Sequence, residues 1–127
     1  MTTLRERIPT TDPERLTLEV SNHKGVPVVY CGGELDAYTS PWFCELAQQS
    51  LASHHSLAID LTKIEYLDAS FLKVLVQISH QAINLGGSIC LVIGAEQKHI
   101  RRVLEITNLD LVFDFYHDLE VARQLMS

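Results

Sequence analysis

The chain of 127 residues lacks the features that mark several large classes of protein. It has no long block of lysine and arginine, and its 16 acidic and 10 basic side chains give a formal net charge of −6. Nucleic acids and anionic membranes select clustered positive charge, so we expect neither as a partner. The N-terminus has no apolar segment of the signal-peptide kind, and every apolar run is far shorter than the roughly 20 residues of a membrane span, so no membrane insertion is expected.

Residues for metal binding and catalysis are also scarce. The three cysteines, Cys31, Cys44 and Cys90, form no CxxC pair, which favours buried reduced thiols and a location in the reducing cytoplasm. The six histidines make neither HxxxH nor HExxH, and the chain has no P-loop and no GxSxG motif. We therefore expect no metal, no cofactor and no catalytic residue, so that the protein is not an enzyme.

The length favours one domain with a sizeable core. Residues 1–14 are polar, contain Pro9 and Pro13 and show no periodicity, so we expect a flexible tail there and a single domain over residues 15–127. In that domain strands alternate with helices, which predicts crossover connections. The expected fold is α/β, with a mostly parallel central sheet, an N-terminal hairpin strand and about four helices. Strands are expected at 15–20, 26–31, 56–61, 88–93 and 111–116, and helices at 41–53, about 70–84, 95–109 and 118–126.

The polar residues of greatest interest follow two of these strands. In an open parallel sheet, the loops after the carboxyl ends of the strands form the edge where ligands and partners bind. Asp36 follows the strand at 26–31, and the segment 62–70 is expected as a loop after the strand at 56–61. Asp68 can act as the N-cap of the next helix, or Ser70 can cap it. In both cases the Ser70 hydroxyl lies at the positive end of a helix, within reach of another protein.

Three segments in this order resemble one known family. They are "VVYCGGELDAYTSP", "LAIDLTKIEYLDASFLKVL" and "GGSICLVIGAEQKHIRRVLEITNLDLVFDFYHDLEVA". They are similar to the STAS family, which contains bacterial anti-sigma factor antagonists and related domains of sulfate transporters. The resemblance covers residues 15–126, almost the whole chain, and implies a STAS-like fold.

The resemblance also implies a function and a site. Ser70 matches the hydroxyl that is phosphorylated in such antagonists, and Asp68 and Asp36 match the aspartates beside it. The expected partner is an anti-sigma factor serine kinase of the GHKL type, which the unmodified protein sequesters, while a PP2C-type phosphatase removes the phosphate. Asp36, Asp68, Ala69 and Phe71 are the expected partner-binding residues. Ala69 and Phe71 depart from the family pattern, which has a second hydroxyl and a glycine at these positions.

Two other functions stay open at this point. The first is a STAS module that is never phosphorylated and acts as an adaptor subunit of a signalling scaffold or a lipid-transport complex. The second is a small nucleotide-binding or hydrolytic protein that uses Asp36, Asp68 and Ser70, although no phosphate-binding loop supports it.

Overall fold

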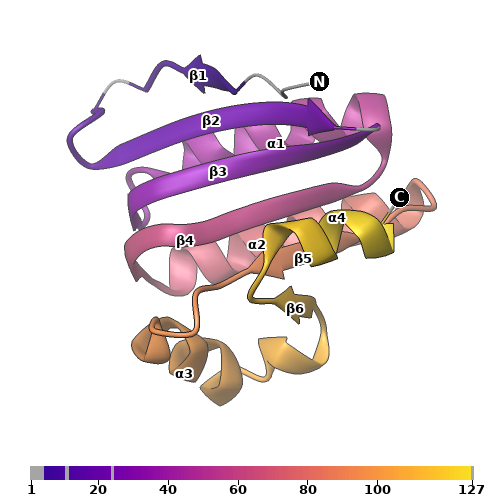
Figure 1. The fold of residues 1–127 in the computed structure, drawn as a ribbon. Coiled ribbons are helices and arrows are strands. Elements are labelled where there is room, and N and C mark those ends of the chain that lie inside the picture. Colours follow the sequence, from indigo (N-terminus) through magenta and orange to yellow (C-terminus); the bar gives the residue numbers. More distant parts are fainter. Residues whose placement is uncertain (1–4, 11, 24, 127) are drawn as a thin grey trace.

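The computed structural model describes residues 5–10, 12–23 and 25–126, which form a six-stranded sheet with helices on both faces (Figure 1). The strands lie across the sheet in chain order. The strands are β1 (Glu6–Ile8), β2 (Leu16–His23), β3 (Val26–Leu35), β4 (Leu57–Leu67), β5 (Ile89–Val92) and β6 (Asp114–Tyr116). The helices are α1 (Ser40–His54), α2 (Ala69–Asn84), α3 (Lys98–Ile106), the short 3-10 helix η1 (Leu109–Leu111) and α4 (Leu119–Met126).

The sheet is mixed. The pairs β1–β2 and β2–β3 are antiparallel, whereas β3–β4, β4–β5 and β5–β6 are parallel. The parallel part follows from the crossover helices, because each of them returns the chain to the same end of the sheet before the next strand. The predicted α/β fold with an N-terminal hairpin strand is confirmed.

The prediction of a flexible tail over residues 1–14 is wrong for Glu6–Ile8, which form the edge strand β1. Ile8 pairs with Leu18 and packs against the core, so burial of one apolar side chain accompanies the strand pairing. A strand of three residues is too short to show an alternating pattern in the sequence. Residues 1–4 and 11 of the predicted tail lie outside the described residues.

The loop predicted at 62–67 is also wrong, because β4 continues to Leu67. The partner strand β3 is longer than predicted as well, and its last residues pair with the end of β4. Gly32 lies opposite Lys63 and Leu35 lies opposite Leu67, with two shifts of register along this part of the ladder. These irregularities break the period-2 pattern, which explains why the strand was not recognised there.

The two faces of the sheet are covered unequally. Helices α1 and α2 lie side by side on one face, and α4 lies on the other (Figure 1). The larger core lies under α1 and α2 and contains the fully buried rings of Phe43 and Phe71. On the opposite face, Ala122 of α4 packs over a smaller group of residues from β3, β4 and β5. Because α1 and α2 run parallel, their N-termini lie at the same edge of the sheet (Figure 1).

A buried glutamine attaches α3 to the far end of β4. The Gln97 side chain donates hydrogen bonds to the carbonyls of Leu61 and Ile64, both at 2.9 Å, and accepts one from the Gly94 amide at 2.7 Å. Pairing between β4 and β5 stops at Asp60, so β5 offers these two carbonyls no partner. Gln97 satisfies them, and it fixes the start of α3 against the strand segment that leads to the candidate site.

The cysteines are all free thiols. Cys31 and Cys90 are buried as predicted, but Cys44 is partly exposed. Burial raises the pKa of all three thiols, to about 12 for Cys90, and nearby carboxylates of Asp60 and Asp114 raise those of Cys31 and Cys90 further. The thiols are therefore protonated at neutral pH and are poor nucleophiles. Within the described residues, every helix is too short or too polar to cross a membrane.

Candidate functional site

Asp36 and Asp68 lie next to each other at the carboxyl edge of the sheet. Each directly follows the last residue of a strand, and these two last residues, Leu35 and Leu67, are register partners in the parallel pair β3–β4. The amide of Asp68 also donates a hydrogen bond to the carbonyl of Leu35 at 3.1 Å. The sheet therefore holds the two loops together, as expected from the strand order.

Asp68 is the N-cap residue of α2. Its backbone is extended, and its Oδ1 atom accepts hydrogen bonds from the amides of Ser70 at 2.9 Å and Phe71 at 3.3 Å. These amides belong to the first turn of the helix and have no partner within it, so the carboxylate satisfies them and also complements the positive end of the helix dipole. Of the two caps that the sequence allowed, Asp68 is the one that forms.

Ser70 is the second residue of α2 and is partly exposed, beside the exposed Ala69. Its backbone amide is bound by Asp68, but its hydroxyl has no hydrogen-bond partner among the residues that the structure describes. A hydroxyl without an internal bond is available to a partner molecule. The position therefore meets the geometric requirement for a residue that another protein reads or modifies.

Phe71 is not part of this exposed surface. Its side chain is 0% exposed and its ring packs edge-on against Phe43 of α1, with 5.1 Å between ring centroids. The expectation that Phe71 contacts a partner is therefore wrong for this conformation, because the side chain fills the core between α1 and α2. The residue stands where the family pattern has glycine, yet it adds no bulk to the surface around Ser70.

Asp36 uses its carboxylate to hold its own loop. Oδ1 accepts hydrogen bonds from the amides of Tyr38 and Thr39, both at 2.9 Å, and Oδ2 forms an ion pair with Arg15. Burial raises the pKa of this carboxyl, but the hydrogen bonds from Thr39 and Tyr38 and the charge of Arg15 outweigh burial and hold the pKa below its ordinary value. Asp36 thus shapes the loop beside Ser70.

Thr39 is the N-cap residue of α1, although its hydroxyl does not bind the helix amides. The hydroxyl accepts a hydrogen bond from the Asp36 amide at 3.0 Å and donates one to the carbonyl of Glu34 at 2.8 Å. Pro41 lies in the first turn of the helix, as predicted. The loop is therefore held by reciprocal hydrogen bonds, from the Thr39 amide to the Asp36 carboxylate and from the Asp36 amide to the Thr39 hydroxyl.

Arg15 belongs to the site although the sequence alone did not single it out. Its guanidinium lies 3.4 Å from Glu34, is paired with Asp36 and lies 5.3 Å from the centre of the Tyr38 ring. The sequence does contain one signal for Arg15. If the residues of the β2–β3 hairpin are paired outward from its turn, Arg15 lies opposite Glu34, and the two side chains carry opposite charges. The link to Asp36 depends on the loop conformation and has no such signal.

Gly33 brings Arg15 this close. Its φ is +102°, and a Cβ atom built on it would lie 2.1 Å from the carbonyl oxygen of Arg15. Only glycine fits there, because both the backbone conformation and the space exclude a side chain. The Glu34 amide then donates a hydrogen bond to the same carbonyl at 2.8 Å. The close approach of the two chain segments positions the Arg15 side chain over the Asp36 loop.

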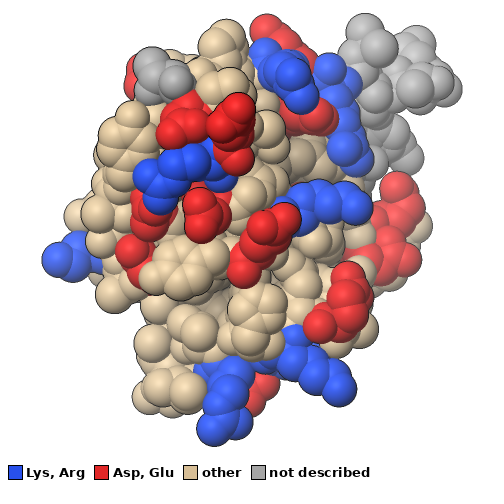
Figure 2. Space-filling model, turned by 90° about the vertical axis from the view of Figure 1, so that its left-hand side faces the viewer, with Lys and Arg blue, Asp and Glu red and all other residues tan. Residues whose placement is uncertain are grey.

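Two exposed tyrosines complete the surface. Tyr38 is 56% exposed and packs edge-on against Trp42, and Tyr66 is 51% exposed at the end of β4, opposite Glu34. Figure 2 shows the edge of the molecule to which β3 and β4 point, with charged side chains spread among wide uncharged areas. Exposed aromatic rings between charged groups are typical of protein-interaction surfaces.

The site offers no metal centre. Across residues 5–10, 12–23 and 25–126, histidine, cysteine, aspartate and glutamate form no group of three or more that would hold a metal ion. The Asp36 carboxylate is bound to Arg15 and to amides, and the Asp68 carboxylate caps α2. With both carboxylates engaged in this way, the arrangement fits a recognition surface.

Comparison with known proteins gives one consistent result. Residues 17–122 match the STAS domain family. Anti-sigma-F factor antagonist RsfB of Mycobacterium tuberculosis is 31% identical over 111 residues, which cover 87% of this chain and 88% of RsfB. The crystal structure of an anti-sigma factor antagonist from Mycobacterium paratuberculosis superimposes with a TM-score of 0.76 at 28% identity, covering 90% of this chain and 96% of that one.

A more distant structure shares the fold. An anti-sigma factor antagonist (STAS) domain protein from Planctomyces limnophilus gives a TM-score of 0.71 at 17% identity, over 87% of this chain and 97% of its own. The family match spans most of the chain, and the M. tuberculosis relative exceeds 30% identity over nearly its whole length. The chain belongs to the STAS domain family.

Proposed function

We propose that this protein is an anti-sigma factor antagonist that binds an anti-sigma factor kinase through the surface around Ser70. The similar proteins from Mycobacterium tuberculosis and Mycobacterium paratuberculosis are both named as anti-sigma factor antagonists. The observation that carries the proposal is Ser70, which is partly exposed in the first turn of a capped helix and whose hydroxyl has no hydrogen bond to another described residue. Such proteins act in the cytoplasm, where sigma factors and ATP are present.

The second part of the proposal is that phosphorylation of Ser70 switches binding off. The Ser70 oxygen attacks the γ-phosphorus of ATP bound to a GHKL-type kinase, ADP leaves, and the hydroxyl proton passes to a base of the kinase. The phosphate adds about −1.5 to −2 charges at neutral pH. Asp68 already places a carboxylate at this helix end, so the new charge meets a like charge and alters a surface that fitted the kinase.

Burial of Phe71 favours this function over an unphosphorylated adaptor. The case for the adaptor rests on the bulk of phenylalanine at the glycine position of the family, and that bulk lies in the core. At position 69 the family pattern has a residue with a hydroxyl, and this chain has alanine. The methyl group of Ala69 adds little bulk beside Ser70. The chain acts in this scheme as a substrate and a binder, and a PP2C-type phosphatase restores the binding form.

The proposal is tested by phosphotransfer. The purified chain is incubated with ATP and each candidate GHKL-type kinase from the same organism, and the phosphate is located by mass spectrometry of peptides. We expect one phosphate on Ser70, none on Ser70→Ala and removal by the phosphatase. Phosphate on another residue, or tight binding of the kinase without transfer, contradicts the switch. A Ser56→Ala variant, which changes a serine elsewhere in the fold, is the matched control and should be phosphorylated normally.

A further inference from the structure

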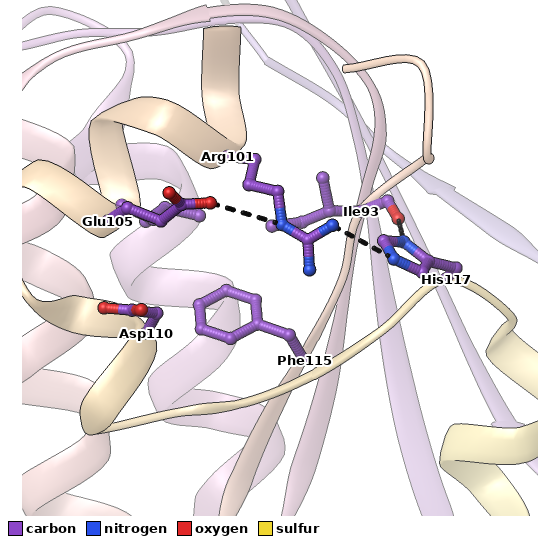
Figure 3. A pocket seen from close by; sticks show the side chains of 7 residues that line it. Ile93, Arg101, Glu105, Asp110, Phe115 and His117 are labelled. Atoms are coloured by element: carbon purple, nitrogen blue, oxygen red, sulfur yellow. Dashed lines mark hydrogen bonds and ion pairs between the residues drawn. The ribbon is translucent and has the colours of Figure 1, made fainter. Parts of the chain in front are cut away.

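A small cavity lies between α3, η1 and β6 and shares no residue with the Ser70 surface (Figure 3). Its volume is about 80 Å³. Ile93 and Leu104 are buried in its wall, and the Phe115 ring lines it from β6. An engineered cavity of about 150 Å³ holds a benzene molecule, so this one holds about three or four non-hydrogen atoms of a ligand whose other atoms lie at the mouth.

Charged and polar side chains complete the lining. They are Arg101 and Glu105 from α3, Asp110 from η1, and His117, which directly follows β6. A ligand with only negative charge would meet the carboxylates of Glu105 and Asp110, and a ligand with only positive charge would meet the guanidinium of Arg101. The lining therefore favours a ligand that carries both charges over a simple anion or a simple cation.

The guanidinium of Arg101 is held in one orientation by two of its nitrogens. Nε lies 3.5 Å from a carboxylate oxygen of Glu105, and Nη1 lies 3.3 Å from Nε2 of His117. Nδ1 of His117 lies 2.8 Å from the carbonyl oxygen of Ile93. A carbonyl only accepts, so Nδ1 donates this hydrogen bond and Nε2 accepts one from Arg101.

The remaining nitrogen of Arg101, Nη2, has no partner among the residues that the structure describes. Figure 3 shows it turned toward the Phe115 ring, between the side chains that line the cavity. A planar guanidinium that is already fixed at two of its nitrogens loses little freedom when the third one binds a ligand. Nη2 is therefore a preoriented donor for a carboxylate.

The other end of the cavity is acidic. Asp110 is exposed, and its carboxylate has no partner among the described side chains. Figure 3 shows Asp110 on one side of the Phe115 ring and the guanidinium of Arg101 on the other. The cavity thus combines a free acceptor, an apolar floor and a free donor. A small molecule with an ammonium group, a short carbon skeleton and a carboxylate matches this arrangement.

We propose that this cavity binds a small free amino acid. The carboxylate of the ligand accepts a hydrogen bond from Nη2 of Arg101, its ammonium group donates to the carboxylate of Asp110, and its carbon atoms lie against the Phe115 ring. The volume of the cavity selects a short side chain, as in glycine or alanine. The proposal is independent of the function proposed for the Ser70 surface, because the two sites have no residue in common.

A titration of the 15N-labelled full chain with glycine and with L-alanine, followed by two-dimensional NMR, tests this inference. A ligand of about six non-hydrogen atoms binds weakly, so we expect a Kd of about 1 mM and shifts centred on the amides of the cavity residues. Acetate and methylammonium each carry only one of the two charges and should bind about tenfold more weakly. Acetate that binds as tightly as glycine, or no shift with either amino acid at about 20 mM, overturns the inference.

Three variants make the test specific for the two proposed contacts. Arg101→Gln and Asp110→Asn each remove one charge from the cavity and should weaken the binding of L-alanine by about tenfold. Arg102→Gln removes the neighbouring cation of α3, which does not line the cavity, and is the matched control that should leave the Kd unchanged. The dispersion of the NMR spectrum reports whether each variant is folded. An unchanged Kd in folded Arg101→Gln or Asp110→Asn, or an equal loss in Arg102→Gln, overturns the inference.

Discussion

The carboxylate of Asp68 accepts a hydrogen bond from the amide of Ser70 at 2.9 Å, so an acidic residue caps the helix that carries the proposed phosphorylation site. This contact predicts distinct results for two substitutions. Asp68→Ala removes the cap and should lower the free energy of unfolding by about 1 kcal/mol, whereas Asp68→Asn keeps a capping oxygen and should cost a few tenths, roughly 0.3 kcal/mol. Urea unfolding followed by circular dichroism measures both. Equal losses would contradict a capping role for the side chain.

Phe71 should act on stability and not on partner recognition. Phe71→Ala leaves a cavity beside Phe43 and should lower the free energy of unfolding by about 3–5 kcal/mol. Phe71→Leu, which keeps most of the apolar volume, should cost only about 1 kcal/mol. The folded Phe71→Leu protein should bind the kinase as the wild type does in isothermal titration calorimetry. A large loss of affinity in that variant would show that Phe71 contributes to binding of the kinase.

The lowered pKa of the Asp36 carboxyl predicts that the stability of the fold depends on pH. Its pKa in the folded protein lies below the ordinary value of 3.8, so the charged form stabilises the fold. This contribution is fully present above about pH 4 and is lost as the pH falls through the folded pKa. The difference in unfolding free energy between wild type and Asp36→Asn should therefore be largest near neutral pH and shrink below about pH 4.

Urea titrations at several pH values measure this difference. Arg15→Gln removes the cation that pairs with Asp36 and should reduce the acid-dependent loss without abolishing it, because the amides of Tyr38 and Thr39 still bind the carboxylate. A difference that stays constant down to low pH would show that the charge of Asp36 does not stabilise the fold.

Gly33 should tolerate no side chain. Gly33→Ala places a Cβ atom against the Arg15 carbonyl and also strains a backbone with positive φ. Gly25 also has a positive φ, but a Cβ atom there would meet nothing within 4 Å. Gly25→Ala is therefore the matched control and should cost about 1–2 kcal/mol from strain alone, with Gly33→Ala clearly more destabilising. Thermal unfolding compares the two, and equal losses would contradict the steric argument.

The sequence predicted those parts of the fold that repeat a regular pattern. The alternation of strands and helices predicted the α/β architecture. The expectation that the segments after the strands at 26–31 and 56–61 share one edge of the sheet placed Asp36 and Asp68 there, although both strands run further, to Leu35 and Leu67. The strand β1 and the end of β4 were missed, because a three-residue strand and an irregular ladder leave no periodic signal.

The sequence predicted only the part of the candidate site that is formed by residues close together in the chain. Asp68 and Ser70 are close in the chain, so a helix cap could be deduced from local spacing. Arg15 reaches Asp36 only through the hairpin register and a loop conformation that Gly33 allows, and Tyr38 and Tyr66 meet this surface through tertiary packing. The inward turn of Phe71 depends on the space beside Phe43, which no local pattern encodes.

The most direct test of the account is the affinity of the partner kinase for the chain before and after phosphorylation of Ser70. Isothermal titration calorimetry should give tight binding for the unmodified chain and for Ser70→Ala. Phosphorylation, or Ser70→Glu, should weaken binding by about 5- to 150-fold, corresponding to a coupling of about 1–3 kcal/mol. An affinity that does not change when Ser70 is phosphorylated would contradict the central claim that this hydroxyl is the switch.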